Sequence, residues 1–195
     1  MTLALIAAMH EELSAVLELM PDERRERVAG REFWVGHLGG QEVVAVLSGI
    51  GKVAAATTAT LAIQRFGAQA LLFTGVAGGL GKGVRVGDLV IATELLQHDM
   101  DASPIFPRHE LPLYGLSRLP SDAAMSARLH QAAQALAGQA AHHLGEDTLA
   151  AFGICTPVVH QGLIVSGDRF VSTAAESRAL RSELPDALAV EMEGA

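Results

Sequence analysis

Short runs of apolar residues alternate along the chain with longer segments whose apolar residues recur at helical spacing. A short apolar run is typical of a strand covered on both faces, and apolar positions three and four residues apart are typical of an amphipathic helix. The pattern predicts strands at Leu3–Ala8, Glu32–His37, Glu42–Ser48, Ala70–Thr74, Asp88–Leu96, Val158–Ser166 and Ala187–Met192. It predicts helices at Glu11–Met20, Lys52–Phe66, Asp122–Ala137 and Ala174–Glu183.

The alternation of these elements predicts one α/β domain over residues 1–195, with a largely parallel sheet covered by helices on both faces. Leu38–Gln41 (LGGQ), between two predicted strands, is a hairpin signal. Pro21–Arg25 is rich in charge, and we expect a solvated loop there. Proline-rich Asp101–Pro120 and Gly138–Val158, which is rich in Ala, Gly and His, have the character of insertions within the domain.

Composition argues against several classes of function. The 195 residues carry a formal net charge of -8, and they show no basic stripe of the kind that binds nucleic acid. No apolar run reaches the ~18 residues needed to span a bilayer, and the N-terminus lacks the features of a signal peptide. Cys155 is the single cysteine, which fits a reducing compartment. We therefore expect a cytoplasmic protein that binds neither nucleic acid nor membrane.

Two glycine-rich segments follow predicted strands, Ser48–Lys52 (SGIGK) and Thr74–Gly81 (TGVAGGLG). Parallel sheets bind ligands at the carboxyl ends of their strands, and glycine there allows a backbone amide to approach a ligand. The second segment has neither the spacing of a phosphate loop nor that of a dinucleotide-binding fingerprint. Taken alone, both segments are explained equally well as tight turns.

Several segments are more informative as a set. They are Ala8–Glu12 (AMHEE), Ser48–Val53 (SGIGKV), Thr74–Leu80 (TGVAGGL), Val86–Asp88 (VGD), Leu163–Phe170 (LIVSGDRF) and Val190–Glu193 (VEME). In order and spacing the set resembles the nucleoside phosphorylase and nucleosidase superfamily, specifically the 5′-methylthioadenosine/S-adenosylhomocysteine nucleosidases, although the region between residues 101 and 160 matches poorly. The resemblance implies a three-layer α/β/α fold around a central mixed, mostly parallel sheet, usually as a homodimer. It also implies hydrolysis of the N-glycosidic bond of an adenine nucleoside to adenine and a 5-thioribose derivative, with no metal or organic cofactor.

By this resemblance Glu12 is the catalytic residue. A carboxylate can orient and deprotonate water beside an oxocarbenium-like ribose carbon. The resemblance also implies that Glu193 accepts hydrogen bonds from the ribose hydroxyls, and that Gly78 lets the chain pass close to the ligand. Because residues i and i+2 of a strand share a face, we expect Glu191 and Glu193 on one face of the last strand.

The resemblance places further residues around the base and the 5′ side of the substrate. It implies that Phe170 stacks on adenine and that the backbone of Val171 hydrogen-bonds the purine edge. Met9 and Met192 would supply soft apolar surface to the sugar and the 5′-thio group, for which a flexible thioether is suited. Ile50 would line the 5′ side.

Each of these assignments has a structural alternative. Acidic residues at a helix start complement the helix dipole without any further role. We keep that interpretation for Glu11 and, with the other motifs present, prefer the catalytic one for Glu12. Phe170 and Met192 by themselves would be core residues.

Two other groups of residues invite a chemical interpretation that their spacing does not support. His98–Asp101 (HDMD), with His109 and Glu110 nearby, has no known metal-ligand spacing. Cys155 lacks an obvious activating partner, so we expect no nucleophilic role for it.

The chain departs from the family pattern at two places. Many of these nucleosidases have Ser where this chain has Val76, so one polar contact near the attacking water or sugar is lost, and the activity or the exact substrate is expected to differ. The family also continues past the Met-Glu-Gly motif to an Asp that protonates purine N7. We therefore expect the chain to be C-terminally incomplete relative to the family, and a protein of these residues alone to be inactive or very slow, and less stable.

Other functions remain open at the level of sequence. A nucleoside phosphorylase uses phosphate in place of water, but Met9–Leu13 offers two acids and no base where phosphorylases of this superfamily carry an Arg. Futalosine-type hydrolysis is a closer relative of the proposed reaction. A protein that binds nucleosides without catalysis is the alternative from a different class.

Overall fold

The computed structural model describes residues 1–195, which form two compact units. The first unit comprises Met1–Val76 and Met192–Gly194, and the second comprises Ala77–Glu191 and Ala195. Each unit has its own five-stranded sheet. The predicted α/β class is therefore confirmed, with the strands divided between two mixed sheets.

The sheet of the first unit has the strand order β2-β3-β4-β1-β5. β1 pairs in parallel with both β4 and β5, whereas β2, β3 and β4 form an antiparallel meander. The strands are β1 (Leu3–Ala7), β2 (Arg24–Val28), β3 (Arg31–Leu38), β4 (Gln41–Leu47) and β5 (Ala70–Phe73), and the helices are α1 (His10–Glu18) and α2 (Lys52–Phe66).

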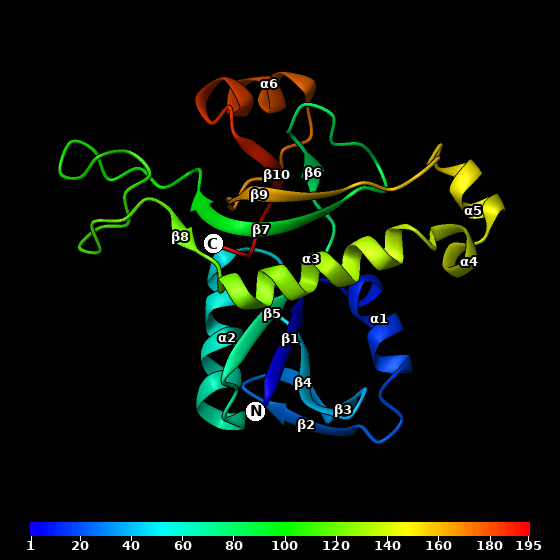
Figure 1. Cartoon of the computed structure of the whole chain (residues 1–195). Coiled ribbons are helices and arrows are strands. Elements are labelled where there is room, and N and C mark those ends of the chain that lie inside the picture. Colours follow the sequence, from blue (N-terminus) through cyan, green and yellow to red (C-terminus); the bar gives the residue numbers. More distant parts are fainter. The chain divides into compact units, whose positions relative to one another are not determined.

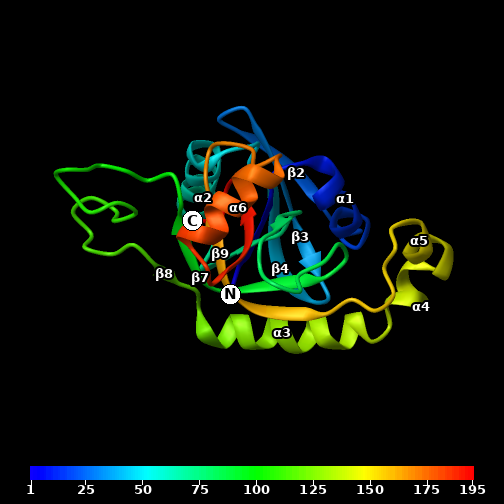
Figure 2. The same ribbon diagram turned by 90° about the horizontal axis from the view of Figure 1, so that it is seen from above.

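Alternate residues of these strands face two different helices. α1 and α2 lie on opposite faces of the sheet (Figures 1 and 2). Leu5 and Ala7 pack with Leu13 of α1, whereas Ala4 and Ile6 pack with Ala62 of α2. This alternation explains why β1 is apolar throughout, because both of its faces are covered.

The second sheet has the strand order β6-β10-β9-β7-β8. β9 pairs in parallel with β7 and β10, and the two edge strands are antiparallel. The strands are β6 (Gly78–Gly79), β7 (Leu89–Gln97), β8 (Leu119–Pro120), β9 (Val159–Ser166) and β10 (Ala187–Glu191), and the helices are α3 (Ala123–Ala137), α4 (Ala140–Leu144), α5 (Glu146–Ala151) and α6 (Ala174–Glu183).

Side-chain caps set the starts of the two longer helices of this unit. The Asp122 carboxylate accepts the N–H of Met125 at 2.7 Å at the start of α3. At the start of α6, Thr173 and Glu176 form a reciprocal capping box. Leu180 of α6 then packs with Leu163 and Val165 of β9 in the core of the unit. These caps are sequence signals, which is why both helices are predicted to within a residue of their bounds.

The structure corrects the prediction in two charged or irregular regions. Pro21–Arg25 is not wholly a loop, because β2 begins at Arg24 and pairs with β3. Gly138–Val158 contains the two short helices α4 and α5. Asp101–Pro120 ends in the short strand β8, and the rest of it is mostly turns that extend away from β7 in Figures 1 and 2. None of the helices combines the length and apolar composition needed to cross a membrane.

Asp88 fixes the N-terminal ends of β7 and β9 to each other. Its Oδ1 accepts the N–H of Val158 at 2.8 Å, and its Oδ2 accepts the N–H of Arg85 at 3.0 Å and lies 2.9 Å from His160 Nε2. Burial alone would raise the pKa of the Asp88 carboxyl, but these hydrogen bonds and the proximity of His160 lower the pKa below its usual value. The carboxylate form is therefore favoured in the folded protein.

Asp88→Asn should lower the free energy of unfolding at pH 7 by about 1–3 kcal/mol, because the amides of Arg85 and Val158 lose a charged acceptor. A lowered folded-state pKa stabilises the fold above the unfolded value of about 4, and this contribution is lost as the pH falls through the folded value. Thermal unfolding between pH 7 and pH 3 should thus show the wild type and the variant converging in acid. Asp147→Asn, at an exposed position, is the control, and a difference that stays constant with pH would contradict the prediction.

Candidate functional site

The carboxyl ends of three adjacent parallel strands, β4, β1 and β5, meet at one edge of the first sheet. The N–H of Ser48 donates to Ala7 O at 2.8 Å, and the N–H of Thr74 donates to Ile6 O at 2.9 Å. The pairing therefore continues just past the strand ends. It brings together the segments that carry Met9 and Glu12, the Ser48–Lys52 turn, and Thr74–Val76. This is the edge at which such sheets bind ligands.

Glu12 is fixed at this edge by backbone amides. Its Oε2 accepts the N–H groups of Ala8 and Met9, both at 3.0 Å, and its Oε1 accepts the N–H of Val76 at 2.9 Å. Glu12 is the third residue of α1, and its bond to the N–H of the N-cap residue Met9 is that of a capping glutamate. The third hydrogen bond comes from the segment after β5, which a cap does not require. The carboxylate is thus held between two strand ends and is partly exposed.

Gly75 leaves the space that the Glu12 carboxylate occupies. A Cβ at Gly75 would lie 2.7 Å from Glu12 Oε1 and 3.0 Å from Cδ. The backbone of Gly75 does not have a positive φ, unlike that of Gly49 and Gly51 in the neighbouring turn. Close approach, and not backbone conformation, therefore requires glycine at position 75.

Glu193 lies in the first unit against the start of α2. Its Oε1 accepts the N–H of Gly51 at 2.8 Å, and Gly51 is the N-cap of α2 with a φ of 98°. The first turn of α2 contains no acidic residue, so Glu193 supplies the negative charge that the positive end of the helix dipole favours. A second predicted carboxylate is thus anchored on a backbone amide.

The other predicted residues of this unit are mostly open to solvent. Ile50 is 61 % exposed, Val76 73 % and Met9 36 %. Met192 is partly buried. Exposed apolar side chains beside fixed carboxylates are the surface expected of a site for a ligand with both polar and apolar parts.

Three predicted residues, Gly78, Phe170 and Val171, belong to the second unit. Phe170 is 73 % exposed, so it is not a core residue, whereas Val171 packs against the core of the unit. No backbone hydrogen bond within the chain uses the N–H or C=O of Val171. Gly78 pairs with Val190, and a Cβ at Gly78 would lie 3.2 Å from the Val190 side chain.

The expectation that Glu191 and Glu193 share a strand face is wrong. β10 ends at Glu191, whose last pairing partner is Ser166 of β9, and Glu193 lies beyond the ladder. Strand alternation stops where pairing stops. The carboxylate of Glu191 instead accepts a hydrogen bond from the Ser166 hydroxyl in the second unit.

The residues of the His98–Asp101 segment are directed to separate partners. Asp99 Oδ2 accepts the N–H of Asp168 at 2.8 Å, and Asp101 Oδ1 accepts the hydroxyl of Ser103 at 2.6 Å. His109 Nε2 lies 2.9 Å from Glu183 Oε1. The structure contains no group of three or more His, Cys, Asp or Glu side chains that could hold a metal ion.

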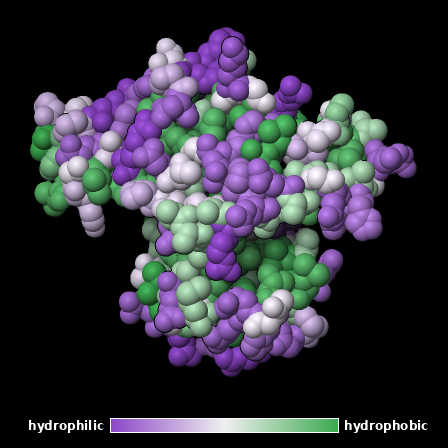
Figure 3. All heavy atoms as spheres, in the orientation of Figure 1, coloured by the Kyte–Doolittle hydropathy of each residue, from purple (hydrophilic) through white to green (hydrophobic).

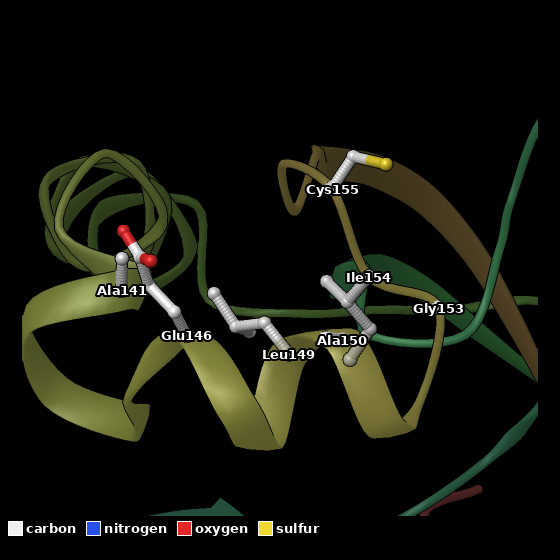
Figure 4. Close-up of a pocket in the computed structure, with 7 residues that line it drawn as sticks. All are labelled: Ala141, Glu146, Leu149, Ala150, Gly153, Ile154 and Cys155. Atoms are coloured by element: carbon white, nitrogen blue, oxygen red, sulfur yellow. The ribbon is translucent and has the colours of Figure 1, made fainter.

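A pocket of about 490 Å³ lies in the second unit, and none of its lining residues is a predicted site residue. Figure 4 shows these residues on α4, on α5 and in the segment that follows α5. They are Ala141, Glu146, Leu149, Ala150, Gly153, Ile154 and Cys155. The lining is apolar apart from Glu146 and Cys155, so it lacks the convergent polar groups of a catalytic site.

Sequence reasoning missed the backbone amides that fix the two carboxylates, and the space left by Gly75. The signal for Gly75 was present, since it lies between a predicted strand and Val76 in the TGVAGG segment. It also missed the link from Asp99 to Asp168. Apart from the local bonds of Glu12 to the Ala8 and Met9 amides, these contacts join residues far apart in sequence, so no local pattern identifies them.

Comparison with known proteins adds independent information. The family model described as "Phosphorylase superfamily" matches residues 2–195. A 5′-methylthioadenosine/S-adenosylhomocysteine nucleosidase from Anoxybacillus flavithermus is 35 % identical over 196 residues, which cover 100 % of this chain and 76 % of the relative. The nucleosidase of the same description from Maridesulfovibrio salexigens is 34 % identical and covers 100 % of this chain and 77 % of the relative.

Solved structures are similar over the same range. The nucleosidase from Neisseria meningitidis, in complex with methylthio-immucillin-A, superposes with a TM-score of 0.80 at 36 % identity, covering 99 % of this chain and 76 % of that chain. The nucleosidase from Streptococcus pneumoniae, in complex with 8-aminoadenine, has a TM-score of 0.84 at 32 % identity, covering 100 % of this chain and 76 % of that chain.

The contact between Gly75 and Glu12 predicts a measurable cost for a single methyl group. Gly75→Ala should lower the free energy of unfolding by about 1–3 kcal/mol, because the methyl group overpacks against the carboxylate. Gly138→Ala is the matched control: its φ is -66°, and a Cβ there would lie no closer than 3.6 Å to its neighbours. It should change stability by less than about 0.5 kcal/mol. Urea unfolding that showed equal stabilities for the two variants would contradict the packing argument.

Proposed function

Because the chain belongs to the 5′-methylthioadenosine/S-adenosylhomocysteine nucleosidase family of the phosphorylase superfamily, we propose that it hydrolyses the N-glycosidic bond of an adenine thionucleoside. The products are adenine and a 5-thioribose derivative. The observation that carries the proposal is the Glu12 carboxylate, fixed by three backbone amides at the carboxyl edge of the first sheet. Such an edge is where a parallel sheet binds a small ligand.

Glu12 acts on the attacking water. As the bond between C1′ and the purine nitrogen breaks, the electron pair leaves with the base and positive charge develops on the ribose. Water adds to C1′ as its proton passes to Glu12, and the departing base takes up a proton from solvent, so that adenine leaves as the neutral base. The three amide donors leave one lone-pair direction of the carboxylate for this water, since a carboxylate offers about four. A base already held in position needs no reorganisation during the reaction.

Glu193 holds the sugar. Its anchor on Gly51 fixes one oxygen, and its carboxylate accepts hydrogen bonds from the ribose hydroxyls, which strengthen as the sugar becomes positive. Met9, Met192 and Ile50 supply the apolar surface for the sugar and the 5′-thio substituent. Thioether and branched aliphatic side chains suit such a surface because they bury apolar area without polar groups to satisfy.

The base is recognised by residues of the second unit. The exposed ring of Phe170 stacks on adenine, and the N–H and C=O of Val171, which no other residue uses, are available to the purine edge. Gly78 lets the chain pass close to the ligand. Val76, in place of a hydroxyl-bearing side chain, leaves the substrate one polar contact fewer, and we propose that this alters the choice of substrate.

We also propose that residues 1–195 belong to a single nucleosidase domain, and that the protein is a homodimer in the cytoplasm. The single family match from residue 2 to residue 195 supports the domain assignment. Apolar side chains on the loop of residues 101–118, green at the far left of Figure 3, support association because exposed apolar clusters mark interaction surfaces. They are Ile105, Leu113 and Leu116, which are 81 %, 90 % and 48 % exposed.

Sedimentation of the purified protein tests the homodimer. The expected mass is twice that of the chain, and Ile105→Ser together with Leu113→Ser should shift it toward one chain. The double variant Thr57→Ser and Thr60→Ser, on exposed positions of α2, is the control and should leave the mass unchanged. A monomeric wild type at micromolar concentration would exclude the dimer.

Glu12→Gln should reduce kcat for adenine release from methylthioadenosine by a factor of about 100 to 10,000, because the general base is lost. Affinity for a ground-state ligand such as adenine should change little, since Glu12 contacts the water. The measurement is adenine release by protein expressed from its full reading frame, with and without inorganic phosphate.

Glu11→Gln is the matched control, because Glu11 is the exposed neighbour on the same helix turn. Its kcat should equal that of the wild type. Unchanged turnover in Glu12→Gln would remove the proposed mechanism, and release that depends on phosphate would assign the protein to the phosphorylases. Adenine binding without turnover in the wild type would indicate a nucleoside-binding protein.

A further inference from the structure

The His98-Asp99 pair is a motif of the sequence to which the proposed chemistry gives no role. It follows directly after β7, which runs parallel to β9 with Gln97 opposite Ser166. Figure 1 shows the two strands side by side. The N–H of His98 donates to Ser166 O at 2.9 Å. The pair therefore leaves the sheet beside Gly167–Val171, the loop that carries the residues proposed to bind the base.

His98 packs against the first residue of this loop. Its side chain is buried, and a Cβ at Gly167 would lie 2.2 Å from His98 Nε2. On its other side, Gly167 donates its N–H to Glu191 O at 3.2 Å. The start of the loop is thus confined between β7 and β10, and only glycine fits there.

Asp99 fixes the second residue of the loop. Its Oδ2 accepts the N–H of Asp168 at 2.8 Å. Beyond the loop, Glu176 Oε2 accepts the N–H groups of Ser172 and Thr173 at 3.3 and 3.1 Å as part of the cap of α6. Hydrogen bonds therefore fix the backbone on both sides of Arg169, Phe170 and Val171.

We propose that His98 and Asp99 are positioning residues for the base-binding loop. The inference rests on the proposed function, in which Phe170 and Val171 bind adenine. Asp99 fixes the position of the backbone just before Phe170 and Val171, and the side chain of His98 packs against Gly167. A loop already fixed in its binding conformation loses less entropy when the ligand binds. Neither side chain contacts the base.

Adenine binding to the purified full-length protein, measured by calorimetry, tests the proposal. Asp99→Ala should weaken adenine binding at least tenfold, because the acceptor for the Asp168 N–H is lost. Asp99→Asn keeps an oxygen acceptor and should remain within about threefold of the wild type. Asp101→Ala removes an acidic residue two positions away whose carboxylate accepts hydrogen bonds from the N–H and hydroxyl of Ser103 and not from the base-binding loop. It should bind adenine as the wild type does.

Adenine binding by Phe170→Ala shows whether a negative result contradicts the positioning role of Asp99 or the proposed function itself. If Phe170→Ala weakens adenine binding and Asp99→Ala does not, the positioning role is wrong and the proposed function stands. If the wild type does not bind adenine, or Phe170→Ala binds it normally, the assignment of the base-binding loop is wrong. Equal losses in Asp99→Ala and Asp99→Asn would also overturn the positioning role.

Amide hydrogen exchange in the wild type gives a measurement that does not depend on a variant folding. The Asp168 amide should exchange at least tenfold more slowly than those of Phe170 and Val171, because Asp99 accepts its hydrogen. Equally fast exchange at all three amides would overturn the proposal. Where Asp99→Ala folds, protection at Asp168 should be lost and protection of the β9 amides retained.

Discussion

The hydrogen bonds from three backbone amides to the Glu12 carboxylate are the constraint on which the candidate site of the first unit depends. Two donors belong to the chain leaving β1 and the third to the chain leaving β5. Parallel pairing puts these two segments next to each other, and Gly75 leaves the space in which the carboxylate fits. The position of Glu12 is therefore a property of the sheet's register. If the pairing of β5 shifted by one residue, the amide of a neighbouring residue would take the place of the Val76 amide. A side chain would then occupy the space that Gly75 leaves open.

Backbone amides also hold other carboxylates of the chain in place. Glu193 is bonded to the amide of Gly51, Asp99 to that of Asp168, and Asp88 to those of Arg85 and Val158. Amides are fixed by the backbone and carry no net charge, so they orient a carboxylate without supplying a cation. A protein with 22 acidic and 14 basic residues can thus place several carboxylates at strand ends. An arginine at such an edge would favour phosphate, and amide anchoring leaves the edge suited to water and sugar hydroxyls.

Sequence predicted most of the elements because their signals are local. α2 has the predicted bounds, since an alanine-rich segment lies between Gly51 and Gly67, and the Gly39-Gly40 turn joins β3 to β4 as expected. The division of the strands into two sheets, the pairing of charged β2 and the end of β10 at Glu191 depend on partners distant in sequence. The motifs named the candidate residues of the site. The amides that orient those residues are invisible in the sequence, because every residue type except proline supplies an N–H.

The side chain and the backbone of Val76 have different consequences for the site. The side chain is aliphatic where the resemblance to the family leads us to expect a hydroxyl. The backbone N–H donates to Glu12 Oε1, a contact that every residue except proline can make. The Val76 side chain is 73 % exposed and takes no part in that bond. The substitution therefore leaves the Glu12 carboxylate in place and alters only the surface beside it. This geometry therefore favours an altered choice of substrate over the loss of the carboxylate that we propose as the general base.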